Sequence, residues 1–337
     1  MPRWIDTLQP LIERATVFLK RYPGLVALFG FVSGLASFFL VDRQAGLAKV
    51  IAAVMLVSWI WLALGHSLHR WLERRFGLRL PPPLLQYATQ MIHQESLFFI
   101  LPFFIITTSW NTGQALFTGV LGGAALVSIL DPIYYRGLAP RRWLYLAFHS
   151  LTLFAVLLTA LPIILQLDTA QSYRWALGIA LLLALPSLAA LTSQGWRRWL
   201  LAPLLLVALA GAGWLARLWV PPATLWLNQV AIAHEVRERA PAERLQRVSL
   251  ERLNAEGLYA YTAINAPRGL SERIQHVWRL NGQEVDRITL SIQGGREDGY
   301  RAWTHKRNFP ADPRGKWQVQ VLTEAGQLIG MLRFEVE

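Results

Sequence analysis

The chain has 337 residues, of which 54% are apolar, and it contains no cysteine. The absence of cysteine excludes a disulfide framework, a thiolate nucleophile and a cysteine-ligated metal centre. The formal net charge is +12, but residues 1–221 hold 17 Lys and Arg against 7 Asp and Glu, whereas residues 222–337 hold 16 against 14. Because the C-terminal part is nearly neutral, it lacks the basic footprint of a nucleic-acid-binding domain, and we expect no nucleic-acid partner.

The apolar residues cluster in long runs that end near Val220. A helix needs roughly 20 apolar residues to cross a bilayer core of about 30 Å. Seven runs meet this length or nearly meet it, and together they predict a multi-pass membrane domain over residues 24–220. The third run is the least regular because it begins with polar residues. The runs are 24–41, 45–65, 90–110, 114–135, 143–165, 174–194 and 199–219.

The N-terminal residues 1–23 predict a cytoplasmic amphipathic segment or, equally well, a plain extension of the first span. Trp4, Leu8 and Leu11 share one helical face, and basic residues surround them, as in helices that lie on a membrane surface. No small-residue cleavage site follows the first apolar run, so we expect no cleavable signal peptide.

Positive charges alternate from loop to loop and predict the orientation of the chain. Short loops rich in Lys and Arg remain in the cytoplasm. The other loops are poor in basic residues, so the N-terminus is predicted inside and the C-terminal domain outside, which in a bacterial inner membrane means the periplasm. The basic residues of the predicted cytoplasmic loops are Arg3, Arg14, Lys20, Arg21, Arg70, Arg74, Arg75, Arg79, Arg136, Arg141, Arg142, Arg197 and Arg198.

Ionisable residues inside predicted spans are costly and face the bundle interior in pairs. Glu95, Asp131 and His149 fall at a similar depth near the cytoplasmic side, and His93 belongs to a polar stripe on another face of the Glu95 helix. We expect these residues to form an intramembrane polar layer. Three interpretations stay open: a functional layer that carries protons or binds a polar ligand or metal, a structural hydrogen-bond network, and side chains that reach the headgroups.

From residue 221 to 337 the apolar pattern alternates with period two, which predicts strands. The dipeptide Asn281-Gly282 lies between two such runs and is a strong hairpin signal. About seven short strands predict an all-β, immunoglobulin-like sandwich. His276 shares the inward face with Trp278 and is interpreted as a hydrogen-bonded core histidine rather than a ligand or base.

A basic set near one end of the predicted β domain is a candidate surface for lipid headgroups or an anionic glycan, or a solvated face without a ligand. Exposed sheet edges offer a second kind of partner site, because they can accept a strand. The basic set consists of Arg301, Lys306, Arg307, Arg314 and Lys316.

Three stretches, "HVWRLNGQEVDRITLSI", "YRAWTHK" and "GKWQVQVLTEAGQLIG", resemble a bacterial family catalogued as domain of unknown function 2914. The resemblance covers roughly Gln229 to Val336. The membrane half is similar to the uncharacterised multi-pass domain often joined to that family, on the stretches "HQESLFFILPFF" and "DPIYY". The resemblance implies this two-part layout, and it carries over no catalytic residue.

The sequence therefore favours a non-enzymatic protein, in which a membrane bundle anchors a periplasmic module for envelope assembly. Its expected partners are membrane lipids and a periplasmic or membrane protein, with no catalytic residue, cofactor or metal. The first alternative is a transporter or flippase of a polar or lipid-linked substrate. The prolines in spans three to seven and the polar layer favour this alternative. The second is a membrane enzyme that acts on lipid or glycan with Glu95 or Asp131 and His149.

Overall fold

The computed structural model describes residues 10–14, 17–18, 21–22, 28–34, 36, 45–76, 81–192 and 198–337. The predicted segment 1–23 and the first predicted span therefore fall largely outside the described residues. The chain divides into two compact units. One contains Met1–Pro102, Val120–Ala160 and Leu177–Ala210, and the other contains Phe103–Gly119, Leu161–Ala176 and Gly211–Glu337.

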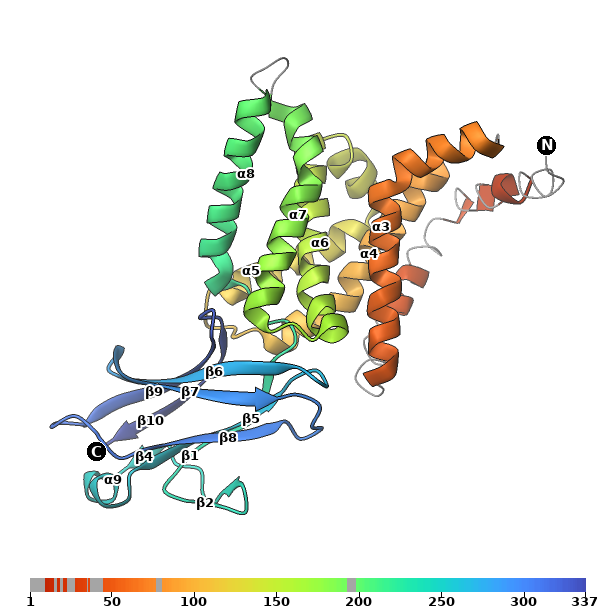
Figure 1. Cartoon of the computed structure of the whole chain (residues 1–337). Helices are drawn as coiled ribbons and strands as arrows, with labels where there is room; N and C mark the ends of the chain where they lie inside the picture. Colours follow the sequence, from red (N-terminus) through yellow and green to blue (C-terminus); the bar gives the residue numbers. More distant parts are fainter. Residues whose placement is uncertain are drawn as a thin grey trace. The chain divides into compact units, whose positions relative to one another are not determined.

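The described chain is helical from residue 45 to residue 219, except for short connections (Figure 1). The helices are α3 (Ala45–Phe76), α4 (Pro82–Thr107), α5 (Gln114–Ile129), η1 (Pro132–Leu138), α6 (Arg142–Leu165), α7 (Thr169–Thr192), α8 (Arg198–Leu215) and η2 (Ala216–Trp219). The helix predicted from residue 90 begins eight residues earlier, at Pro82, because proline is well tolerated in the first turn of a helix.

Four helical segments in the described part of the chain are long and apolar enough to cross a membrane. They are Pro82–Thr107, Arg142–Leu165, Thr169–Ala189 and Leu200–Trp219. A fifth arises if Gln114–Ile129 and Pro132–Leu138, which meet at an angle of 104°, form one broken span. These helices indicate a membrane protein, and the count of seven spans stays a prediction.

The predicted span 114–135 is not a single straight helix. Helix α5 ends at Ile129, and η1 is a π-helix that begins at Pro132, directly after Asp131. Proline cannot donate the backbone hydrogen bond that a continuous helix needs, which accounts for a break at this position. Short π-helical turns are frequent at functional sites. The break redirects the chain, so that Tyr134 and Tyr135 project from a different axis than α5.

The C-terminal region is β-rich, with one short helix, and its strands form two larger sheets and one small one. The three-stranded sheet has the order β1-β5-β8, the five-stranded sheet β4-β10-β9-β6-β7, and β2 pairs with β3. The strands are β1 (Trp226–Ala233), β2 (Val236–Arg237), β3 (Ala240–Pro241), β4 (Arg247–Val248), β5 (Leu258–Asn265), β6 (Ser271–Leu280), β7 (Gln283–Gln293), β8 (Tyr300–Lys306), β9 (Gly315–Thr323) and β10 (Leu328–Val336), and the helix is α9 (Leu250–Glu256).

The two larger sheets share one hydrophobic core, and Figure 1 shows them stacked. Trp278 of β6 is fully buried at its centre, with its ring 6.4 Å from that of Trp317 and 6.2 Å from that of Phe334. The predicted hairpin is confirmed: Asn281 and Gly282 have φ angles of 48° and 86° and connect β6 to β7. Both angles lie in the left-handed region that this two-residue turn requires.

Within the second unit, the β domain contacts the ends of three helical segments. Gln114, at the start of α5, donates from Nε2 to the Leu328 carbonyl (2.8 Å). Gln327 donates to the Val220 carbonyl (2.9 Å), directly after η2. Glu272 of β6 accepts hydrogen bonds from Thr169, at the start of α7. Two of the connections that carry few basic residues, around residues 111–113 and 166–168, thus lie beside the β domain.

Candidate functional site

A buried cluster around His93 joins three helical segments of the first unit. His93 Nδ1 lies 2.9 Å from the Tyr134 hydroxyl of η1, and His93 Nε2 lies 2.9 Å from His149 Nδ1 of α6. His93 is fully buried. A neutral imidazole has one donor and one acceptor nitrogen, so Tyr134, His93 and His149 form a continuous hydrogen-bonded chain. Such a chain holds the helices together and can also pass a proton along its length.

Gln90, one turn before His93 on α4, organises a second set of hydrogen bonds. Its Nε2 donates to Asp131 Oδ1 (2.7 Å) and to the Ser128 carbonyl (3.1 Å), and its Oε1 accepts from the Tyr135 hydroxyl (2.6 Å). The amide thus uses its donors and its acceptor to link α4 to the break between α5 and η1. This linkage fixes Asp131 at the bend.

The predicted polar layer is only partly assembled in this way. No hydrogen bond or ion pair among the described residues joins Glu95, Asp131 and His149 to one another. Glu95 accepts instead from the Ser33 hydroxyl (3.2 Å), Asp131 from Gln90, and His149 pairs with His93. Residues at similar depth on neighbouring helices meet only if they also face each other, and depth is all that the spacing in the sequence indicated.

Two further members of the cluster were not predicted from the sequence. The Trp59 indole nitrogen of α3 donates to the Ser96 hydroxyl (3.0 Å), and the Trp59 ring lies 4.8 Å from that of His149. Tryptophan and serine are common in apolar helices, so neither residue gave a signal of its own. Their contacts add α3 to the helices that surround His93.

In the β domain, His276 is a core residue, as predicted. It is fully buried, and its nitrogens lie 3.3 Å from the Thr262 hydroxyl and 3.1 Å from the Thr304 hydroxyl. Burial lowers the pKa of His276 to about 4. The imidazole is therefore neutral at physiological pH and links β5, β6 and β8.

The predicted basic surface does not form one group. Lys306 is only 4% exposed, and its ammonium lies 2.6 Å from Asp286 Oδ2, so it belongs to the interior and not to the surface. Arg301 lies five residues earlier on the same strand, about 16 Å away. Arg307, Arg314 and Lys316 are exposed and lie near the other end of β8 and the start of β9.

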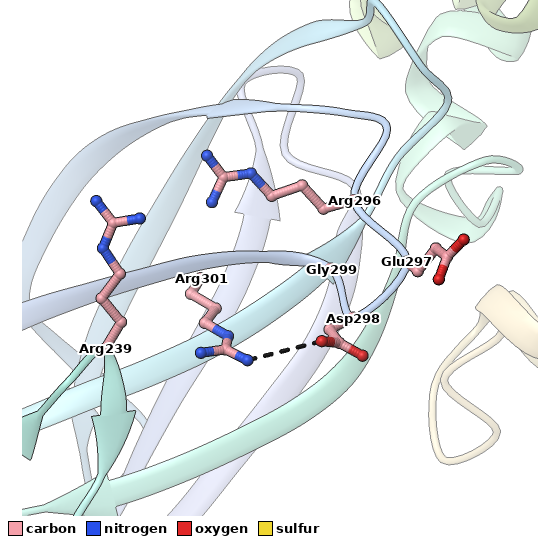
Figure 2. A pocket seen from close by; sticks show the side chains of 6 residues that line it. All are labelled: Arg239, Arg296, Glu297, Asp298, Gly299 and Arg301. Atoms are coloured by element: carbon pink, nitrogen blue, oxygen red, sulfur yellow. Dashed lines mark ion pairs between the residues drawn. The ribbon is translucent and has the colours of Figure 1, made fainter.

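Arg301 instead lines a pocket of about 340 Å³ together with Arg239, Arg296, Asp298 and Glu297 (Figure 2). Arg301 Nη2 lies 3.7 Å from Asp298 Oδ2. Arg239 and Arg296 were not singled out in the sequence, because they come from the β2–β3 turn and the β7–β8 loop and are distant from each other along the chain. The pocket gathers three guanidinium groups from separate segments.

Apolar helices of spanning length and a C-terminal β domain define a membrane protein with an extramembrane module. The chain belongs to the family described as "Family of unknown function (DUF5924)", whose model matches residues 5–260. A second model, "Protein of unknown function (DUF2914)", matches residues 271–336. No curated protein and no solved structure matches the chain.

The two family models divide the β domain between them. The first ends inside β5, and the second begins at the first residue of β6. The resemblance to the second family, predicted to begin near Gln229, is confirmed over a shorter stretch. Since β1, β5 and β8 form one sheet and share a core with the other, both matched regions are needed to complete this domain.

Proposed function

We propose that this chain is a multi-pass protein of a bacterial inner membrane that presents a periplasmic, immunoglobulin-like domain as a non-enzymatic interaction module for envelope assembly. The observation that carries the proposal is that two of the loops poor in basic residues, around residues 111–113 and 166–168, lead into helices whose first residues contact the β domain within one unit. Loops rich in Arg and Lys remain in the cytoplasm. The loops that touch the β domain then belong to the opposite face, and the domain with them.

The strand order supports the immunoglobulin-like assignment. If β1, β5 and β8 are strands A, B and E, and β6, β7, β9 and β10 are strands C, C′, F and G, the sheet orders become A-B-E and G-F-C-C′. Trp278 then occupies the buried tryptophan position of strand C. The Trp317 ring lies beside it, in a chain that has no cysteine for the usual disulfide.

Immunoglobulin-like domains hold variable loops on a rigid core, and binding residues are concentrated on such loops. Because a fold alone does not define a function, the proposal needs a test of both location and binding. Alkaline phosphatase fused after Glu337 should be active and a fluorescent reporter at the same position dark, with the reverse result for fusions near Arg75. A fluorescent fusion after Glu337 would contradict the periplasmic location.

Binding is tested by chemical crosslinking in cells followed by affinity capture of the full-length chain. The test variant carries glutamine in place of Arg307, Arg314 and Lys316, which are exposed. We expect a partner that the unmodified chain retains and this variant loses. If the unmodified chain retains no periplasmic or membrane partner under several conditions, the interaction role is wrong.

The second candidate function is transport of protons or of a polar substrate through the bundle. The hydrogen-bonded chain of Tyr134, His93 and His149 favours it, because buried polar chains in membranes are common in proton relays. The replacements His93→Gln and His149→Gln, which interrupt this hydrogen-bonded chain, separate the two roles. Loss of substrate or proton flux in liposomes with an unchanged melting temperature supports transport, and unchanged flux with a less stable fold contradicts it.

A further inference from the structure

The pocket on the three-stranded sheet is built from segments that are held in place. The β2–β3 hairpin packs over the outer face of this sheet, where Val236 contacts the cluster of Ala231, Tyr261 and Ala263. The tip of the hairpin carries Arg239. Arg301 comes from β8, so a turn and a strand approach the pocket from two directions (Figure 2).

The third arginine, Arg296, lies on the loop between β7 and β8, which backbone contacts fix. Gly294 N donates to the Leu270 carbonyl (2.8 Å), and Gly295 N donates to the Ala266 carbonyl (3.0 Å). The Arg296 guanidinium lies 4.7 Å from the centre of the Tyr300 ring. The loop base and the aromatic ring therefore orient this side chain before any ligand arrives.

The turn that carries Arg239 is strained. Glu238 and Arg239 are the two central residues of the hairpin loop, with φ angles of 49° and 62°. A turn of this kind favours Asn and Gly, because other residues are disfavoured in the left-handed region. Strain of this sort persists where the surrounding structure enforces it, and it is concentrated at functional sites. An arginine at this position is thus unfavourable for the turn itself.

The charges around the pocket are not balanced. Figure 2 shows Glu297 pointing away from the arginines, and Asp298 pairs with Arg301. Among the described residues, Arg239 and Arg296 have no carboxylate within ion-pair distance. The buried Tyr261 hydroxyl also has no hydrogen-bond partner in the described part of the chain. Burial raises the pKa of Tyr261, the charge of Arg301 lowers it, and the charge of Asp298 raises it further; both charged residues line the pocket.

We propose that Arg239, Arg296 and Arg301 form a binding site for a phosphate monoester group. Each guanidinium presents a planar fork of donors that matches two oxygens of a phosphate. A phosphate monoester has three terminal oxygens and can receive three such forks, whereas a carboxylate has only two oxygens. A hollow of about 340 Å³ accommodates the phosphate and part of the group attached to it.

This inference deepens the proposed binding role of the β domain by giving the chemistry of one ligand. It is tested on purified full-length protein in detergent, so it does not depend on which side of the membrane carries the domain. A failed topology experiment leaves it standing, and an absence of phosphate binding leaves the proposed topology standing.

The test is calorimetric titration with inorganic phosphate at constant ionic strength set by sodium chloride. We expect saturable binding that Arg239→Gln and Arg296→Gln each weaken at least about tenfold, as is typical when a hydrogen bond between charged groups is lost. The matched control is Arg333→Gln, which removes the same charge from an exposed position on β10 of the other sheet and should leave the affinity unchanged.

The variant Arg239→Gly separates binding from folding. Glycine relieves the strained turn, so this variant should melt at the same temperature as the unmodified chain or higher, yet lose phosphate binding. Three results overturn the proposal: no saturable binding to the unmodified chain, an equal loss in Arg333→Gln, or full binding by Arg239→Gly. Phosphatidic acid in nanodiscs is then added as a competitor. Competition indicates a lipid headgroup as the ligand, and absence of competition indicates a soluble phosphate.

Discussion

The Glu272 carboxylate accepts two hydrogen bonds from Thr169, one from the backbone amide (2.7 Å) and one from the hydroxyl (2.8 Å). Glu272 is 3% exposed and belongs to β6, whereas Thr169 is the first residue of α7. This contact attaches the β domain to the start of a helix, where the partial positive charge of the helix end also favours a carboxylate.

This contact predicts a dependence of stability on pH. Burial raises the pKa of Glu272 to about 7, against the opposing hydrogen bonds from Thr169 and with further increases from Asp168 and Glu324. Because the folded pKa exceeds that of the unfolded chain, the contribution to stability is fully present below about pH 4.5 and is lost as pH rises through about 7. The change amounts to at most about 3 kcal/mol.

The measurement is the melting temperature of the full-length chain in detergent between pH 5 and pH 8.5. The unmodified chain should melt at a higher temperature at the acidic end. Glu272→Gln cannot ionise and should reduce this slope, while Glu251→Gln, at an exposed position on α9, is the matched control. An identical slope in Glu272→Gln and the unmodified chain would show that another group titrates.

The His93 and His149 pair predicts non-additive effects of substitution. Replacing either residue by alanine leaves one ring nitrogen of the other without its hydrogen-bond partner, and an unsatisfied buried polar group costs about 1–3 kcal/mol. The double variant should therefore be destabilised by less than the sum of the two single variants. Equilibrium unfolding in mixed micelles measures all three free energies, and strict additivity would mean that the two imidazoles do not interact.

The buried ion pair of Lys306 and Asp286 predicts a large effect of removing one partner. Asp286→Asn leaves the Lys306 ammonium, which is 4% exposed, without its carboxylate. Losing one partner of a buried pair costs about 3–5 kcal/mol, and the partial exposure of Asp286 reduces this to about 1–3 kcal/mol. The double variant Lys306→Met with Asp286→Leu should recover most of the loss. Thermal unfolding of the unmodified chain and of the two variants tests this order, and a double variant no more stable than Asp286→Asn would contradict it.

Gly294 is predicted to tolerate no side chain. A Cβ atom at this position would lie 1.9 Å from the Pro267 carbonyl oxygen, which is backbone and cannot move aside cheaply. Gly294→Ala should lower the unfolding free energy by more than about 2 kcal/mol, in the range of severe single substitutions. Gly119→Ala is the control, because its Cβ would meet no atom within 4 Å. Equal melting temperatures for the two variants would contradict the close approach of Gly294 to Pro267.

Local patterns in the sequence predicted the elements of the β domain well. Asn281-Gly282 allowed only a tight hairpin, and the alternation around Trp278 placed that ring and His276 inside. The segment 237–254 has no clear apolar period, and it contains the short strands β3 and β4 and the start of the helix α9. Its elements are too short for a periodic pattern, and they are held by contacts with the rest of the domain.

The sequence by itself determined where the chain is apolar enough for a membrane, where it changes to strands, and which loops carry the positive charge, because these depend on composition and spacing over a few neighbouring residues. Only the tertiary structure decided that His93 meets His149, that Glu95 accepts a hydrogen bond from Ser33, and that Arg239, Arg296 and Arg301 line one pocket. These contacts between side chains depend on the rotation of each helix about its axis and on the path of each loop. Tertiary packing determines both the rotation and the path, and no short stretch of sequence encodes them.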